Sequence, residues 1–107
     1  MIRHIVLFSA KNQADVEVIR DGLSILRDIP GSHHFEVAYN SKRDGLSKEI
    51  DVIVYGEFDS YEALEAYKAH PLYEESIRRV RPLREIRMAV DFESAFAHSS
   101  LARETAA

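Results

Sequence analysis

The 107-residue sequence has no cysteine, no long apolar run and no basic block. The lack of cysteine excludes a disulfide framework, a thiolate metal site and a cysteine nucleophile. No apolar stretch reaches the length of a membrane span, and the apolar start, residues 1–8, is too short for the hydrophobic part of a secretory signal. The 14 Lys and Arg are dispersed among 18 Asp and Glu, which argues against nucleic-acid binding. We therefore expect a cytoplasmic protein with neither a membrane nor a nucleic-acid partner.

What the chain does contain suits one globular domain. Apolar residues make up 46% of the sequence, which is enough for a single packed core. Period-two alternation predicts strands at residues 2–9, 33–40, 49–58 and 86–93. Several of these segments carry apolar residues on both faces, as expected for strands inside a sheet.

Two helical regions separate the predicted strands. Spacing of three and four predicts a helix over residues 13–29, and a second region begins at the N-cap candidate Ser60 and is broken at His70-Pro71. The resulting order, β-α-β-β-α-β, predicts an α+β ferredoxin-like fold with both helices on one face of an antiparallel sheet. Residues 94–107 show no period, so we expect a domain over residues 1–93 and a C-terminal tail.

The face of this sheet without helices is predicted to be apolar. Its predicted members are Ile5, Leu7, Ile53 and Tyr55. Exposed together, they would form a patch of several hundred Å² or more, which monomers rarely tolerate. A twofold homodimer that packs sheet on sheet and closes a barrel-like core is the simplest solution. The alternative is that the tail, through Phe96 and Leu101, folds over this face within one chain.

The segment from Tyr67 to Tyr73 holds the candidate chemistry of the second helical region. Pro71 favours an extended His70 and a new helix directly after it, so His70 is predicted to end one helix and begin the next. The positive end of the helix dipole favours a neutral imidazole, which suits a catalytic base and equally suits a helix cap. Tyr67 is either a hydroxyl donor in a pocket or a packed ring.

Other titratable residues give weaker signals. His4 shares a face with Val6 and Phe8, so it is a pocket base or a core histidine. The adjacent His33 and His34 point to opposite faces of a strand and cannot chelate one ion together, so no metal site is predicted. Glu74 with Arg78 and Glu75 with Arg79 form i,i+4 pairs, which favours a salt-bridged solvent face over an anion clamp for the arginines after residue 77. These arginines are Arg78, Arg79, Arg81 and Arg84.

Four segments together resemble the stress-responsive dimeric α/β barrel (Dabb) family. They are Met1–Phe8, Ile29-Pro30-Gly31, Phe58–Leu64 and Tyr67–Pro71. The resemblance covers roughly residues 1–93 and implies homodimers of ferredoxin-like protomers. The enzymatic relatives are similar to olivetolic acid cyclase, which folds a linear polyketide by an aldol-type condensation with a tyrosine and a histidine in a pocket between sheet and helices.

The resemblance transfers some of these residues and not others. His4 matches the histidine of the first strand and Tyr67 the pocket tyrosine, but Tyr73 and Val52 stand where the cyclase has histidines. Tyrosine, with a reference pKa of about 10, is a poor base near neutral pH, so the fold transfers without the cyclase mechanism. Some relatives bind magnesium through backbone carbonyls at the end of the first helix. In this chain those carbonyls would lie near Leu26, Ile29 and Ser32.

Three hypotheses for function follow. The first is a small dimeric binding protein whose pocket receives a small apolar or aromatic molecule. The second is a cofactor-free enzyme, a cyclase or related lyase or oxygenase, with Tyr67 as donor to a carbonyl and His4 or His70 as base. The third is a structural or stress-linked interaction module without a ligand. The predicted pocket residues are His4, Val6, Phe8, Ile19, Val52, Val54, Tyr67 and Tyr73.

Overall fold

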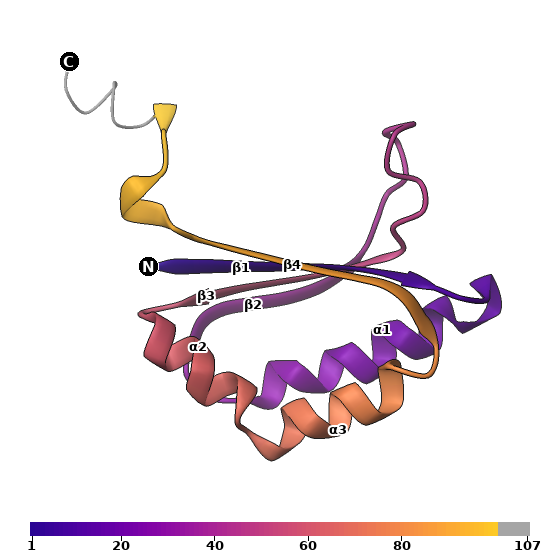
Figure 1. Ribbon diagram of the computed structural model, residues 1–107, viewed down its shortest axis with the longest axis horizontal. Helices are drawn as coiled ribbons and strands as arrows, with labels where there is room; N and C mark the ends of the chain where they lie inside the picture. Colours follow the sequence, from indigo (N-terminus) through magenta and orange to yellow (C-terminus); the bar gives the residue numbers. More distant parts are fainter. Residues whose placement is uncertain (101–107) are drawn as a thin grey trace.

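A computed structural model of the chain describes residues 1–100 and shows a four-stranded antiparallel sheet in the order β2-β3-β1-β4. The strands are β1 (Ile2–Ala10), β2 (Ser32–Tyr39), β3 (Val52–Phe58) and β4 (Arg84–Glu93). The helices α1 (Val16–Ser24), α2 (Tyr61–Lys68) and α3 (Pro71–Val80) all lie on one face of the sheet (Figure 1). This arrangement confirms the predicted ferredoxin-like fold. Within residues 1–100 we find no helix with the length and apolar character needed to cross a membrane.

The joint between α2 and α3 forms as the sequence predicts. His70 is extended (φ −70°, ψ 143°), and its Nδ1 accepts a hydrogen bond from the Leu72 N–H at 3.1 Å. Pro71 occupies the first turn of α3, where its missing N–H leaves no acceptor unsatisfied. At the start of α2, the Ser60 hydroxyl accepts from the Ala63 N–H at 3.1 Å, which confirms the predicted cap.

The predicted first helix over residues 13–29 is divided into three segments. A 3₁₀ turn at Gln13–Asp15 precedes α1, and another at Ile25–Asp28 follows it. The Asn12 side chain accepts from the Ala14 N–H at 2.9 Å and so begins the first, tighter turn. Such 3₁₀ turns are common at helix ends, where periodicity alone does not distinguish them from α-helix.

Close packing of α1 against α3 sets the position of α3 over the sheet. A Cβ atom at Gly22 would lie 2.9 Å from Cγ2 of Val80, so only glycine permits this approach. One turn earlier on α3, the buried Ser76 hydroxyl donates to the Gly22 carbonyl at 2.9 Å. The two contacts fix the helix that forms one wall of the cavity described below.

The part of the sheet face opposite the helices that surrounds Ile5 and Leu7 is apolar, as predicted. Ile5 lies opposite Tyr55 on β3 and Val90 on β4, and Leu7 lies opposite Ile53 and Met88. Val90 is 55% exposed and Met88 59% exposed in the protomer.

The tail does not cover this face within residues 1–100. Phe96 is 84% exposed, and Leu101 lies outside the described residues. The loop between β2 and β3 and the turn at Ser94–Phe96 rise on the helix-free side at opposite ends of the sheet (Figure 1). Together they border the apolar face without covering it.

Candidate functional site

A cavity of about 280 Å³ lies between the helix side of the sheet and helices α1, α2 and α3. Strands β1, β3 and β4 supply its floor, and α3 supplies much of its opposite wall. Apolar side chains form most of the lining, and its polar groups are a His–Tyr group and several arginines. The lining residues are His4, Val6, Phe8, Leu23, Leu26, Val54, Tyr67, Tyr73, Ser76, Ile77, Val80, Arg81, Arg84 and Arg87.

His4 is fixed in the cavity floor by a carboxylate on the edge strand. It is 1% exposed, and its Nδ1 lies 2.5 Å from Oδ1 of Asp91, its register partner on β4. A carboxylate only accepts, so Nδ1 carries the proton and Nε2 is the basic nitrogen of the neutral ring. Burial lowers the pKa of His4, and the bond to Asp91 offsets this only in part. The imidazole is therefore neutral near pH 7, with one nitrogen able to accept a proton.

Tyr67 places a protonated hydroxyl beside this imidazole. Its ring centroid lies 6.2 Å from that of His4, 5.0 Å from that of Phe58 and 5.2 Å from that of Tyr73. Burial raises the pKa of Tyr67, so the hydroxyl remains a donor. No described residue forms a hydrogen bond with this hydroxyl, yet no wholly inaccessible side-chain polar atom in residues 1–100 lacks a partner. The hydroxyl therefore faces the cavity.

Three arginines give part of the cavity lining a cationic character. Arg81 is the C-cap residue of α3, and Arg84 and Arg87 lie on the first part of β4. Nη2 of Arg87 donates to the Tyr73 hydroxyl at 3.3 Å. Burial lowers the pKa of Arg84, and the neighbouring Arg87 and Arg81 lower it further.

These positions correct the interpretation of the arginines as one solvated, salt-bridged face. Arg78 and Arg79 do form ion pairs, both with Glu75. Arg81 and Arg84 instead line the cavity, because the chain turns between α3 and β4 and redirects the side chains after Val80. The helical i,i+4 rule does not extend past the end of the helix.

The structure brings most of the predicted pocket residues together. His4, Val6, Phe8, Val54, Tyr67 and Tyr73 all line the cavity. Three predicted residues lie elsewhere: Ile19 and Val52 are fully buried in the core, and His70 caps α3 with its Nδ1 already engaged. For Ile19 and Val52 the side of the element was predicted correctly, but periodicity does not show which buried positions border a void. His70 takes the capping role that was predicted as the alternative to a catalytic one.

Sequence reasoning missed Asp91 and Arg87 as members of the site. Both lie on the helix side of β4, with Asp91 opposite His4 and Arg87 opposite Phe8. The signal was present, because alternation over residues 86–93 places Arg87, Ala89 and Asp91 on one face. Charged residues on the helix side of an edge strand indicate that the helices do not cover it.

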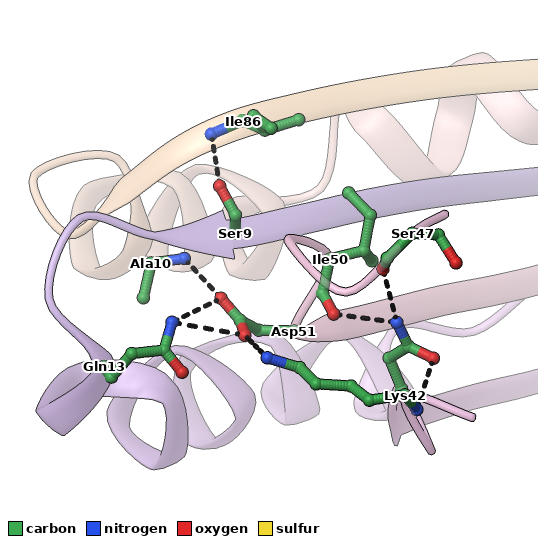
Figure 2. Close-up of polar contacts among 9 residues, drawn as sticks. Ser9, Ala10, Gln13, Lys42, Ser47, Ile50, Asp51 and Ile86 are labelled. Carbon is green, nitrogen blue, oxygen red and sulfur yellow. Dashed lines mark hydrogen bonds and ion pairs between the residues drawn. The ribbon is translucent and has the colours of Figure 1, made fainter. Parts of the chain in front are cut away.

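A second polar cluster lies near the end of β1 and involves the buried Asp51 (Figure 2). Its carboxylate accepts from the Ala10 N–H at 2.9 Å, from Nε2 of Gln13 at 3.3 Å and from Nζ of Lys42 at 2.6 Å. Burial alone would raise the pKa of Asp51, but these donors outweigh it and hold the pKa below its usual value. The cluster ties the loop after β2 to the ends of β1 and β3.

A bulge in β1 lies near this cluster, and a side chain satisfies the backbone group that the bulge leaves unpaired. The register of β1 with β4 shifts between Phe8 and Ala10, and the Ser9 hydroxyl accepts from the Ile86 N–H at 2.9 Å (Figure 2). A side-chain oxygen thus replaces the backbone partner that the bulge removes. Neither this contact nor the Asp51 cluster leaves a group free to bind a ligand.

No group of three or more His, Cys, Asp or Glu in residues 1–100 is arranged to hold a metal ion. The Leu26 carbonyl accepts from the Ile29 N–H at 3.2 Å. A magnesium ion held by backbone carbonyls near Leu26, Ile29 and Ser32 stays a prediction of the resemblance.

One ferredoxin-like sheet, three helices on one face and a lined cavity between them define the class of protein. The family described as Stress responsive A/B Barrel Domain (Dabb) matches residues 2–94. The chain therefore belongs to the Dabb family, as the sequence motifs predicted.

Solved structures agree with this assignment. A Dabb family protein with a ferredoxin-like fold from Mesorhizobium loti is 26% identical, with 86% of this chain and 94% of that chain covered at a TM-score of 0.70. A dimeric ferredoxin-like protein of unknown function from Thermobifida fusca is also 26% identical, with coverage of 85% and 88% and a TM-score of 0.72. A proposed antibiotic biosynthesis monooxygenase from Nitrosomonas europaea shares the fold at 17% identity, with coverage of 90% and 100% and a TM-score of 0.74. The comparison with curated proteins found no match.

Proposed function

We propose that the protein is a homodimer whose cavity binds a small apolar or aromatic molecule that accepts a hydrogen bond. The observation that carries this proposal is the Tyr67 hydroxyl, which faces a largely apolar cavity of about 280 Å³ and has no hydrogen-bond partner in residues 1–100. Apolar cavities with a few convergent polar groups are the usual form of small-molecule sites. An engineered cavity of about 150 Å³ binds benzene, so this volume suits a molecule of about two fused rings.

A titration with a neutral bicyclic ketone, 2-acetylnaphthalene, tests the binding proposal. We expect saturable binding that displaces cavity water and quenches or shifts naphthyl fluorescence. Tyr67→Phe removes the donor to the ketone and is expected to weaken binding about fivefold, the value of one net hydrogen bond. Tyr61→Phe is the matched control, since Tyr61 lies on the same helix and is 52% exposed. Absence of saturable binding by the unmodified protein would overturn the proposal.

The dimer rests on the apolar, helix-free face. Solved relatives from Thermobifida fusca and Jannaschia are described as dimeric. Burying Ile5, Leu7 and their cross-strand neighbours against a second copy removes this surface from water.

Val90→Glu, on the helix-free face, should therefore halve the mass seen by light scattering at micromolar concentration. Val18→Glu, at a 52% exposed position on α1, should leave the mass unchanged. A monomeric unmodified protein, or equal effects of the two variants, would contradict the sheet-on-sheet dimer.

A second candidate function is cofactor-free proton transfer. The pair of His4 and Asp91, with Tyr67 beside it, favours this function, because a neutral imidazole nitrogen and a phenol donor face one cavity. Such a pair takes a proton from a carbon next to a carbonyl while the phenol stabilises the developing oxyanion. Solvent deuterium exchange into bound 2-acetylnaphthalene, followed by proton NMR, tests it. Exchange should disappear in His4→Gln, which retains a side-chain donor toward Asp91.

A further inference from the structure

The arginines of the cavity carry a positive charge that no residue within 1–100 balances. Arg87 pairs in register with Phe8 and Arg84 with Ala10, so they lie beyond His4 along β1. Phe8 is four positions along β1 from His4, roughly 13 Å between backbone positions. The Arg87 side chain nevertheless reaches the Tyr73 hydroxyl, and the Tyr73 ring lies 5.2 Å from that of Tyr67. The Arg87 guanidinium therefore lies near the His4–Tyr67 pair, and its charge acts on both groups.

Within the described part of the chain, no carboxylate reaches these arginines. The cavity lining contains neither Asp nor Glu, and the charged neighbours that act on Arg84 are Arg87 and Arg81. Arg81 has the negative end of the α3 dipole beside it, because it caps the C-terminus of that helix. Arg84 and Arg87 have no such compensation, and the only hydrogen bond of the Arg87 guanidinium within residues 1–100 goes to the neutral Tyr73 hydroxyl.

Two surface arginines in the same region, by contrast, do have a carboxylate partner. Arg78 and Arg79, on the outer side of α3, share the carboxylate of Glu75. The chain has a net charge of −4, so it contains more carboxylates than cationic side chains. A local excess of cations inside a cavity, in an acidic protein, points to an anion that comes from outside.

We propose that Arg84 and Arg87 form a subsite for the carboxylate of the cavity ligand, which is then an aromatic or apolar acid. This deepens the proposed function and rests on it. The guanidinium fork matches the planar carboxylate with two parallel hydrogen bonds. The apolar body of the acid lies along Val6 and Val54.

Two nearly isosteric probes separate the subsite from the cavity itself. 2-Naphthoate carries a carboxylate where 2-acetylnaphthalene carries a neutral acetyl group. The unmodified protein should bind 2-naphthoate at least about tenfold more tightly, the expected gain from charge-assisted hydrogen bonds. This preference should weaken as salt rises, because the subsite opens to solvent at Arg87.

Substitution of Arg84 or Arg87 should reduce the preference for 2-naphthoate over 2-acetylnaphthalene without changing the affinity for the neutral ketone. Arg87→Gln and Arg84→Gln should each weaken 2-naphthoate binding about tenfold and leave 2-acetylnaphthalene binding unchanged. Arg79→Gln makes the same change of charge at an exposed ion pair and should alter neither affinity. Arg84→Lys keeps the charge but loses the fork, so it should retain part of the preference. If Arg84→Gln unfolds, the affinities of Arg87→Gln for the two probes test the subsite alone, because Arg87 is exposed.

The outcomes distinguish the two proposals. Equal affinity of the unmodified protein for both probes overturns the carboxylate subsite and leaves the binding cavity standing. Equal losses for both probes in Arg87→Gln, or losses matched by Arg79→Gln, also overturn the subsite. Failure of both probes to bind overturns the cavity and the subsite together.

Discussion

Two clusters of polar and charged side chains in this small domain differ in how far their charges and hydrogen bonds are satisfied. Around Asp51, a backbone N–H, an amide and an ammonium converge on one buried carboxylate. Around the cavity, Arg84 lies among other cations and the Tyr67 hydroxyl has no partner in residues 1–100. A fully compensated cluster stabilises the fold, whereas uncompensated groups that face a void are available to a ligand. The Asp51 cluster therefore stabilises the fold, and the cavity groups form the proposed ligand site.

The largest effect is expected for Asp51→Asn. The amide cannot satisfy the same donors, and it leaves Lys42 and the Ala10 N–H without their charged acceptor. We expect the free energy of unfolding to fall by about 3 kcal/mol, measured by urea denaturation at pH 7. Asp44→Asn, at an exposed loop position, is the control and should change it by less than about 0.5 kcal/mol. A small loss for Asp51→Asn would remove the structural role of this cluster.

The free energy of unfolding should fall with acid in two separate pH ranges, one set by His4 and one by Asp51. The contribution of His4 is expected to be the smaller. The pKa of His4 is lowered by burial, so the unfolded chain binds more protons than the folded chain below its usual value of about 6.5. Stability should therefore be complete above that pH and fall between pH 7 and pH 5. Urea denaturation of His4→Gln should lack this slope, while His34→Gln, at an exposed site, should retain it.

The contribution of Asp51 should persist to lower pH. Its pKa is also below the usual value, but for a carboxylate this keeps the charged form present in the folded state until the pH falls well below about 3.9. The stability difference between the unmodified protein and Asp51→Asn should thus stay constant from pH 7 to pH 5. A difference that narrows already at pH 6 would show that the carboxylate is not held as the structure indicates.

The smallest effect is expected for Tyr67→Phe. Its hydroxyl has no hydrogen bond to residues 1–100, so its removal should change the free energy of unfolding by less than about 0.5 kcal/mol. The same variant is expected to weaken binding of the proposed ligand. A loss of more than 1 kcal/mol, roughly the value of a buried hydrogen bond, would mean that the hydroxyl serves the fold and would reverse the comparison.

Sequence reasoning reached the fold because the relevant signals are local. Alternation over residues 2–9 shows which side chains share a face, and Pro71 ends one helix and starts the next regardless of distant contacts. His4 and Tyr67 were identified as candidates in the same way. The structure places them at neighbouring positions in one cavity.

The partners of these residues depend on register, which local patterns do not contain. Asp91 is 87 positions from His4 and meets it only because β1 pairs antiparallel with β4 in one particular alignment. Asp51 meets Ala10 across 41 positions in the same way. The arginines were misinterpreted because a helical rule was extended past the end of α3. Each of these contacts is a product of tertiary pairing.

The edge strand has a kinetic consequence. Arg87, Ala89 and Asp91 are exposed although they lie on the helix side of β4, so the helices leave this flank of the cavity open. The proposed ligand would enter and leave the protomer along this flank without any helix having to move. Its residence time would then be set by the strength of its contacts with the cavity. The open flank favours rapid exchange of the proposed ligand over its storage.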